Sequence, residues 1–128
     1  MFGIDDNICR CIYDPGSGQC ADALKDQIGI GGAQGVISVA SNAVPACFAR
    51  ICRFREEFNS GQALALDAKL LELYEFLGVE PNPIPIKAIM SNLGFGHGLR
   101  LPLLSLSDAY QARAAEMTQL CKSVEQSI

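Results

Sequence analysis

Cysteine and histidine are the residue types in this chain that could bind a metal ion. The 128 residues include six cysteines, at positions 9, 11, 20, 47, 52 and 121, and one histidine, His97. A site could be assembled from Cys9, Cys11, Cys20 and His97, but their spacing matches no zinc motif. Because a chain of this length can form a core without disulfides, we interpret the cysteines as reduced, partly buried structural thiols. We expect neither a metal nor a cofactor.

Lysine is the other residue type that could carry chemistry, as a nucleophile that forms a Schiff base. The amine must then lose its proton, which requires burial or a cationic neighbour. Nothing in the sequence around Lys25, Lys69, Lys87 or Lys122 suggests either condition, so we expect solvated ammonium groups. His97 lies between two glycines without an obvious partner and is expected to be an exposed loop residue.

The glycine-rich segment 29–35 (GIGGAQG) could be taken for a phosphate-binding loop. It does not fit the spacing GxGxxG, and it precedes a predicted strand, whereas a dinucleotide-binding loop follows a strand and opens a helix. We therefore interpret it as a tight turn between a helix at 21–30 and a strand at 36–39.

The elements that would position such residues are short strands and several helices. Strands are predicted at 8–13 and 36–39, where apolar runs lie between turn residues. Pro45 suits the first turn of a helix, and Gly61 should separate that helix from the next one. The predicted helices cover 21–30, 45–60, 62–77, 85–93 and 107–125.

The predicted helices differ in how clearly they show a buried side. The helix at 62–77 carries a stripe at intervals of three and four, which must pack against a partner surface: Ala63, Leu66, Leu70, Leu73 and Leu77. In the last helix we expect the apolar side to consist of Ala109, Ala112, Leu120 and Val124. The side chain of Ser107 is expected to cap that helix.

Two segments between these helices are predicted to be irregular. Prolines at 81, 83 and 85 should keep the chain extended ahead of the short helix, because the residue before each proline avoids the helical region. Residues 94–106 are rich in glycine and proline and are predicted to form a loop.

Charge and hydropathy exclude several classes of protein. Ten basic and 14 acidic residues give a net charge of −4, and no basic patch offers a footprint for nucleic acid. No apolar run approaches the ~18–20 residues that a membrane span needs. The N-terminal segment carries acidic residues and no apolar stretch, so we expect no secretory signal and a cytoplasmic location.

Three motifs, taken in order, resemble one known family. GGAQGVISVASN (31–42), VEPNPIPIK (79–87) and LRLPL (99–103) resemble the C-terminal part of the dihydrodipicolinate synthase family. This family belongs to the pyruvate-dependent aldolase superfamily, which also contains N-acetylneuraminate lyase. The resemblance implies an α/β fold: residues 1–60 would be the last two β/α units of a TIM barrel, and residues 61–128 a three-helix C-terminal extension, so that the piece is mostly helical.

The resemblance also implies a reaction. Members of the family condense pyruvate with aspartate semialdehyde in lysine biosynthesis, through a Schiff base on a lysine of the sixth strand. A complete barrel needs ~250 residues, and the units matched here do not include that strand. Lys87 belongs to the NPIPIK motif, which is structural in the family. We therefore expect no catalytic residue in this chain and no activity of the chain alone.

The resemblance implies that some residues of this chain match positions of the family's pyruvate site. Ile37 matches a position whose backbone lines that site, and Ser38, with Ser41 and Asn42, lies at or beyond the end of the same strand. Asp22 agrees with the last residue of the family's Gly-Asp-Asp, although it could instead be a carboxylate at a helix N-terminus. The expected substrate-binding residues are Ile37, Asp22 and Ser38.

Two alternatives to an inactive part of a lyase remain open. The chain could be one subunit of a split enzyme, in which an N-terminal partner chain supplies the other barrel units and pyruvate binds only in the completed barrel. It could also be a helical interaction module that forms a homo-oligomer through its extension helices.

Overall fold

The computed structural model describes residues 38–128, so the predicted strand at 8–13 and helix at 21–30 lie outside the described residues. Within residues 38–128 the structure is helical and contains no strand. One short 3-10 helix is followed by five α-helices in this part of the chain. Their bounds are η3 Ala40–Asn42, α2 Pro45–Glu56, α3 Ser60–Ala68, α4 Leu71–Leu77, α5 Ile84–Asn92 and α6 Asp108–Gln126.

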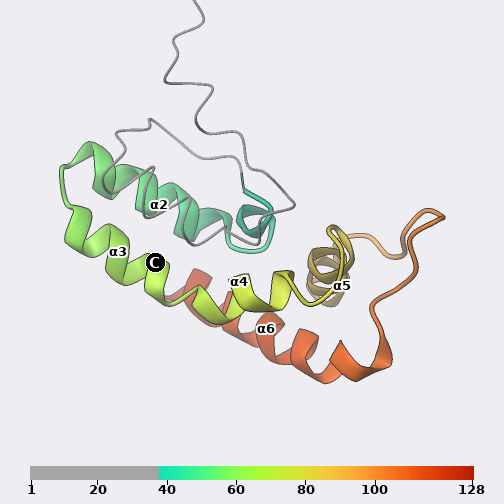
Figure 1. The fold of residues 1–128 in the computed structure, drawn as a ribbon. Helices are drawn as coiled ribbons and strands as arrows, with labels where there is room; N and C mark the ends of the chain where they lie inside the picture. The colour runs from blue at the N-terminus through green and yellow to red at the C-terminus, as the bar shows by residue number, and fades with distance from the viewer. Residues whose placement is uncertain (1–37) are drawn as a thin grey trace, which may run out of the picture.

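The helices form one packed group around a shared apolar core (Figure 1). Helix α2 packs along α3, and α6 runs beside α4 and reaches α2 with its C-terminal part. Helix α5 packs against α6 at the other end of the group, and the segment between these two helices projects outward. The short helix η3 lies against α2, α4 and α5.

Helix α2 begins at Pro45, as predicted, but ends at Glu56 and not at residue 60. Its buried side consists of Cys47, Phe48, Ile51 and Phe54, which recur at helical spacing. The backbone N–H groups of its first turn are bound by a side chain from α6: Ala46 and Cys47 donate to the carboxylate of Glu125, at 3.2 and 2.9 Å. A carboxylate at this end of a helix satisfies donors that lack a partner within the helix.

The prediction of a single helix at 62–77 is wrong. Helix α3 ends at Ala68, α4 begins at Leu71, and Leu70 leaves the helical region with φ −98° and ψ 0°. Gly61 lies within the first turn of α3, which begins earlier because the Asn59 side chain accepts a hydrogen bond from the Gln62 N–H. The N–H of Leu70 still bonds to the carbonyl of Asp67, so the break is a short turn.

The leucine stripe remains buried on both sides of this break. Leu66, Leu70 and Leu73 are buried, as is Phe76, while Leu77 is half-buried. A buried hydrogen bond spans the turn, because the Tyr74 hydroxyl donates to Oδ1 of Asp67 at 2.7 Å. An apolar pattern with intervals of three and four cannot distinguish a continuous helix from two helices joined by one turn.

The proline segment ahead of α5 is a turn and not an extended stretch. The N–H of Ile84 donates to the carbonyl of Pro81 at 2.9 Å, with Asn82 and a cis-linked Pro83 between them. This is the arrangement of a type VI turn, which accepts proline at its third position. Pro85 then lies in the first turn of α5, as predicted, and residues 94–106 form no helix or strand.

Helix α6 begins where the sequence places it, but with a different cap and a different buried side. Ser107 is the N-cap residue, yet its hydroxyl bonds to Glu80 and not to the first turn of its own helix. Ala109 and Ala112 are exposed, Leu120 is half-buried, and of the predicted apolar side only Val124 is buried. The buried side is instead Ala114, Met117, Thr118, Cys121 and Val124, a stripe at intervals of three and four.

No helix of residues 38–128 is both long enough and apolar enough to cross a membrane.

Candidate functional site

Of the expected substrate-binding residues, only Ser38 lies among the described residues; Ile37 and Asp22 lie outside them. Ser38 precedes Val39, whose dihedral angles of −66° and −44° are helical, so the described end of the predicted strand at 36–39 is not extended. The short helix η3 starts at Ala40 and leads the chain into α2.

The polar side chains at and after Ser38 differ in whether they already have a hydrogen-bond partner. The hydroxyl of Ser41 donates to the carbonyl of Ser38 at 2.6 Å, and the Asn42 amide donates to the carbonyl of Val39 at 3.0 Å. Both side chains are therefore engaged in local turns. The Ser38 hydroxyl oxygen is buried and has no hydrogen-bond partner in the part of the chain that the structure describes. Since a buried hydroxyl normally has a partner, Ser38 is the candidate here that could bind a substrate atom.

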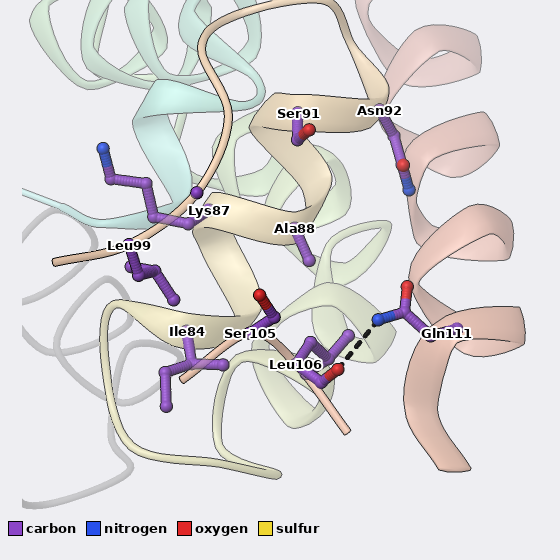
Figure 2. A pocket seen from close by; sticks show the side chains of 10 residues that line it. Ile84, Lys87, Ala88, Ser91, Asn92, Leu99, Ser105, Leu106 and Gln111 are labelled. Carbon is purple, nitrogen blue, oxygen red and sulfur yellow. Dashed lines mark hydrogen bonds between the residues drawn. The ribbon is translucent and has the colours of Figure 1, made fainter. Parts of the chain in front are cut away.

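A hollow of about 190 Å³ lies between α5, the loop at 94–107 and the start of α6 (Figure 2). It brings together two of the sequence motifs, because Ile84 and Lys87 come from VEPNPIPIK and Leu99 comes from LRLPL. Its walls are lined by Ile84, Lys87, Ala88, Ser91, Asn92, Gly98, Leu99, Ser105, Leu106 and Gln111.

Hydrogen bonds fix one side of this hollow. The Gln111 side chain donates to the carbonyl of Leu106 at 2.8 Å, which ties the loop to α6. The Asn92 amide donates to Oγ1 of Thr118 at 3.3 Å, which ties α5 to α6. The polar groups on this side of the hollow thus hold the loop and the two helices together.

The arrangement around Lys87 does not favour a Schiff-base lysine. Lys87 is exposed, and its side chain extends away from Ser105 and Gln111 (Figure 2). No other cationic side chain lines the hollow among the described residues. The expectation that Lys69, Lys87 and Lys122 are exposed at the surface is confirmed, and Lys25 lies outside the described residues.

The remaining candidates for chemistry are His97 and the cysteines. His97 is exposed in the loop, as predicted. No group of His, Cys, Asp and Glu side chains in this part of the chain could hold a metal ion. Cys9, Cys11 and Cys20, the other members of the conceivable zinc site, lie outside it.

The thiols of Cys47 and Cys121 are buried and form no disulfide. Burial raises the pKa of the Cys47 thiol to about 12, and the nearby Glu125 carboxylate adds to this rise. The pKa of Cys121 is raised to about 11 by the same causes in the same order. Because the thiolate is the reactive form, these two cysteines are structural, as predicted, and not nucleophiles.

The polar residues of the hollow, Ser91, Ser105 and Gln111, are not among the site residues predicted from the sequence. Each of these residues is exposed in the structure. Nothing in its spacing along the sequence distinguishes it from an ordinary polar residue at the surface. They come together only because the turn before α5 and the loop after it fold α5 onto α6.

Comparison with known proteins gives a consistent result. Residues 12–120 match the model of the dihydrodipicolinate synthetase family. The 4-hydroxy-tetrahydrodipicolinate synthase of Xanthomonas axonopodis pv. citri is 52% identical over 85 residues, which cover 66% of this chain and 28% of that protein. The enzyme of the same description from Xylella fastidiosa is 35% identical over 109 residues, which cover 85% of this chain and 35% of that protein.

The solved structures that match this chain are also described as dihydrodipicolinate synthase. Dihydrodipicolinate synthase from Aquifex aeolicus matches with a TM-score of 0.67 and 29% identity, over 80% of this chain and 33% of that one. The chloride-inhibited dihydrodipicolinate synthase from Acinetobacter baumannii, complexed with pyruvate, matches with a TM-score of 0.68 and 27% identity, over 82% and 35%. The chain thus spans about a third of the length of the proteins that it matches.

Proposed function

Because this chain belongs to the dihydrodipicolinate synthetase family, we propose that it forms the C-terminal part of a lyase of the 4-hydroxy-tetrahydrodipicolinate synthase type. The observation that carries this proposal is the continuous match of the family model over residues 12–120. The three motifs at 31–42, 79–87 and 99–103 lie within that match. In this proposal the reaction is the condensation of pyruvate with aspartate semialdehyde, and the chain uses neither a metal nor a cofactor.

The proposal divides the chain in two. Residues 1–60 supply the final β/α units of a TIM barrel, with α2 as the last barrel helix, and residues 61–128 supply the helical extension. The packing of η3 supports a specific role for the extension, because α4 and α5 lie against η3 directly after Ser38. Ala40 in η3 is fully buried by these contacts. The extension helices therefore hold the backbone that leads out of the proposed pyruvate site.

The substrate residues proposed in this chain are Ile37, Asp22 and Ser38. Pyruvate would contact the backbone of Ile37, and the buried hydroxyl of Ser38 would bind a polar atom of the substrate or of the site around it. The hydroxyl's lack of a partner within residues 38–128 supports this role. In this proposal the Schiff-base lysine belongs to another part of the complete barrel, and the exposure of Lys69, Lys87 and Lys122 supports this.

Trapping with pyruvate and borohydride tests this assignment. The 128-residue chain should show no mass increase, whereas the intact Acinetobacter baumannii enzyme, which is known in complex with pyruvate, should gain one reduced pyruvate per chain when treated in parallel. Co-expression of the chain with a Xanthomonas relative that lacks the matched third should restore trapping and lyase activity. A lysine of the 128-residue chain that is trapped on its own would overturn the proposal, and so would failure of the two soluble, associated pieces to trap pyruvate.

A helical module for self-association is the second candidate function. The loop between α5 and α6 carries apolar side chains in contact with solvent, since Leu101 is 84% and Leu104 70% exposed. Exposed apolar groups of this kind favour an interface with another chain or with a second copy. Native mass spectrometry of the isolated chain distinguishes the two functions: a stable homo-oligomer that does not bind the remaining barrel units would favour this one.

We also propose a reducing compartment such as the cytoplasm, which the unpaired state of the buried thiols at Cys47 and Cys121 supports.

A further inference from the structure

A second hollow lies where α2, α3 and the C-terminal end of α6 meet, apart from the one in Figure 2. Its volume is about 330 Å³. In Figure 1 the C-terminus lies beside α3, and Ser127 and Ile128 form one wall of the hollow. None of the residues that line it is part of the proposed pyruvate site or of the three family motifs.

The floor of this hollow is apolar and its rim is cationic. Phe54 and Leu66 are buried side chains that line it from α2 and α3. Arg50 and Lys69 lie at its edge, and no acidic side chain lines it among the described residues. Ile128, with its terminal carboxylate, is also part of the lining, and within residues 38–128 that carboxylate forms no ion pair with either cation. A hollow with an apolar floor and a few convergent polar groups has the usual composition of a small-molecule site.

The two cations are placed to bind an anion. The Arg50 guanidinium lies over the Phe54 ring, with 4.4 Å from its central carbon to the ring centroid. This stacking orients the guanidinium but uses none of its N–H donors. Within residues 38–128 the ion pair found joins Arg113 to Glu75 and involves neither Arg50 nor Lys69.

We propose that this hollow binds a small amphipathic carboxylate. The apolar body of the ligand packs on Phe54 and Leu66, and its carboxylate accepts hydrogen bonds from Arg50 and Lys69. Guanidinium and carboxylate have matching planar geometry, and charge-assisted hydrogen bonds are stronger than neutral ones. The volume lies at the lower end of the range for ligand sites, which suits a body the size of one aromatic ring.

Benzoate is a suitable probe, and benzamide is its neutral counterpart of nearly the same shape. In a titration followed by amide NMR, benzoate should cause saturable shifts of the backbone signals of Gln62, Ala65 and Leu66. Benzamide should bind about fivefold or more weakly, because it lacks the charge. This comparison uses the unaltered 128-residue chain and does not depend on the folding of any variant.

Substitutions then test which residues supply the positive charge that binds benzoate. Arg50→Gln and Lys69→Gln should each weaken benzoate binding about five- to tenfold. The matched control Lys122→Gln removes an exposed cation of α6 that does not line the hollow, and it should change binding less than about twofold. Equal binding of benzoate and benzamide, shifts that map to the hollow at α5, or an equal loss in Lys122→Gln would each overturn the proposal.

Discussion

Glu125 and Cys47 are 78 residues apart in the chain, and the carboxylate of the first accepts the backbone N–H of the second at 2.9 Å. The other oxygen of the same carboxylate accepts the N–H of Ala46, so one side chain of α6 binds the first turn of α2. The C-terminal end of α6 is thereby bound to the N-terminal end of α2, next to the buried thiols of Cys47 and Cys121.

Glu125→Ala should lower the free energy of unfolding by about 1–2 kcal/mol, because it leaves two N–H groups at the start of α2 without their acceptor. Urea denaturation followed by circular dichroism measures this loss. Glu116→Ala is the matched control, since Glu116 is an exposed residue of the same helix, and it should change stability by less than about 0.5 kcal/mol. Equal effects of the two substitutions would show that the contact with α2 does not stabilise the fold.

Tyr74→Phe should destabilise the chain by about 1.5–3 kcal/mol, because it removes a hydrogen bond to the buried carboxylate of Asp67 without changing the volume of the ring. Tyr110→Phe provides a comparison, because Tyr110 is half-buried and its hydroxyl makes no hydrogen bond within residues 38–128. The urea midpoints of the two variants should therefore differ clearly. A Tyr74→Phe variant as stable as Tyr110→Phe would contradict the proposed contribution of this bond across the α3–α4 turn.

Phe76→Ala should cost about 3–5 kcal/mol, since Phe76 is fully buried in the core and the substitution leaves a cavity. Phe95 is 66% exposed in the loop, and Phe95→Ala should change stability by less than about 0.5 kcal/mol. Thermal or urea unfolding measures both. The pair tests the packing of α4 directly, because residue type and substitution are the same in the two positions.

The buried thiols should make the fold sensitive to alkaline pH. Their pKa values are raised in the folded state, to about 12 for Cys47 and about 11 for Cys121, so folding keeps protons that the unfolded chain releases near its ordinary thiol pKa. Their stabilising effect is complete below that ordinary value and is lost as the pH rises towards the folded values. Stability should therefore fall more steeply above about pH 9 in the unaltered chain than in Cys47→Ala. Parallel slopes for the two proteins would contradict this.

Iodoacetamide offers an independent measurement of the same thiols. At about pH 8 the folded chain should leave Cys47 and Cys121 unmodified, whereas both should react in denaturant. Peptide mapping by mass spectrometry identifies each cysteine separately. Rapid alkylation of either residue in the folded chain would show that its thiol is accessible.

The sequence predicted those parts of the fold that depend on local signals. Pro45 marks the start of α2, Pro85 lies in the first turn of α5, and the glycines after Leu93 begin the loop before α6. It could not predict the turn between α3 and α4, because the hydrogen bond from Leu70 to Asp67 leaves the apolar spacing unchanged.

Contacts between distant residues account for the other differences. Ser107 has the residue type of an N-cap, but Glu80, which is 27 residues earlier, binds its hydroxyl and its N–H. The buried side of α6 depends on where α4 and α5 pack, and this selects Met117 and Cys121 over Ala109 and Ala112.

The candidate site could be predicted only in part. Ser38, Ile37 and Asp22 all remain predictions, and the buried Ser38 hydroxyl, which has no partner within residues 38–128, is the one observation that bears on them. The hollow with Arg50 and Lys69 could not be foreseen, because Arg50 lies on α2 and Lys69 directly after α3, and the two converge only when α2 packs on α3.

The bond between Glu125 and the start of α2 also bears on the order of events during synthesis. A ribosome makes the residues of α2 well before it adds residue 125, so the N–H groups of Ala46 and Cys47 cannot bind this carboxylate until then. The acceptor arrives only after all the intervening helices have been made, because synthesis adds only about 5–20 residues per second whereas a helix forms in about a microsecond. The last barrel helix of the proposed assignment is therefore completed late, and the backbone beyond Ser38 acquires its final support after translation of the whole extension.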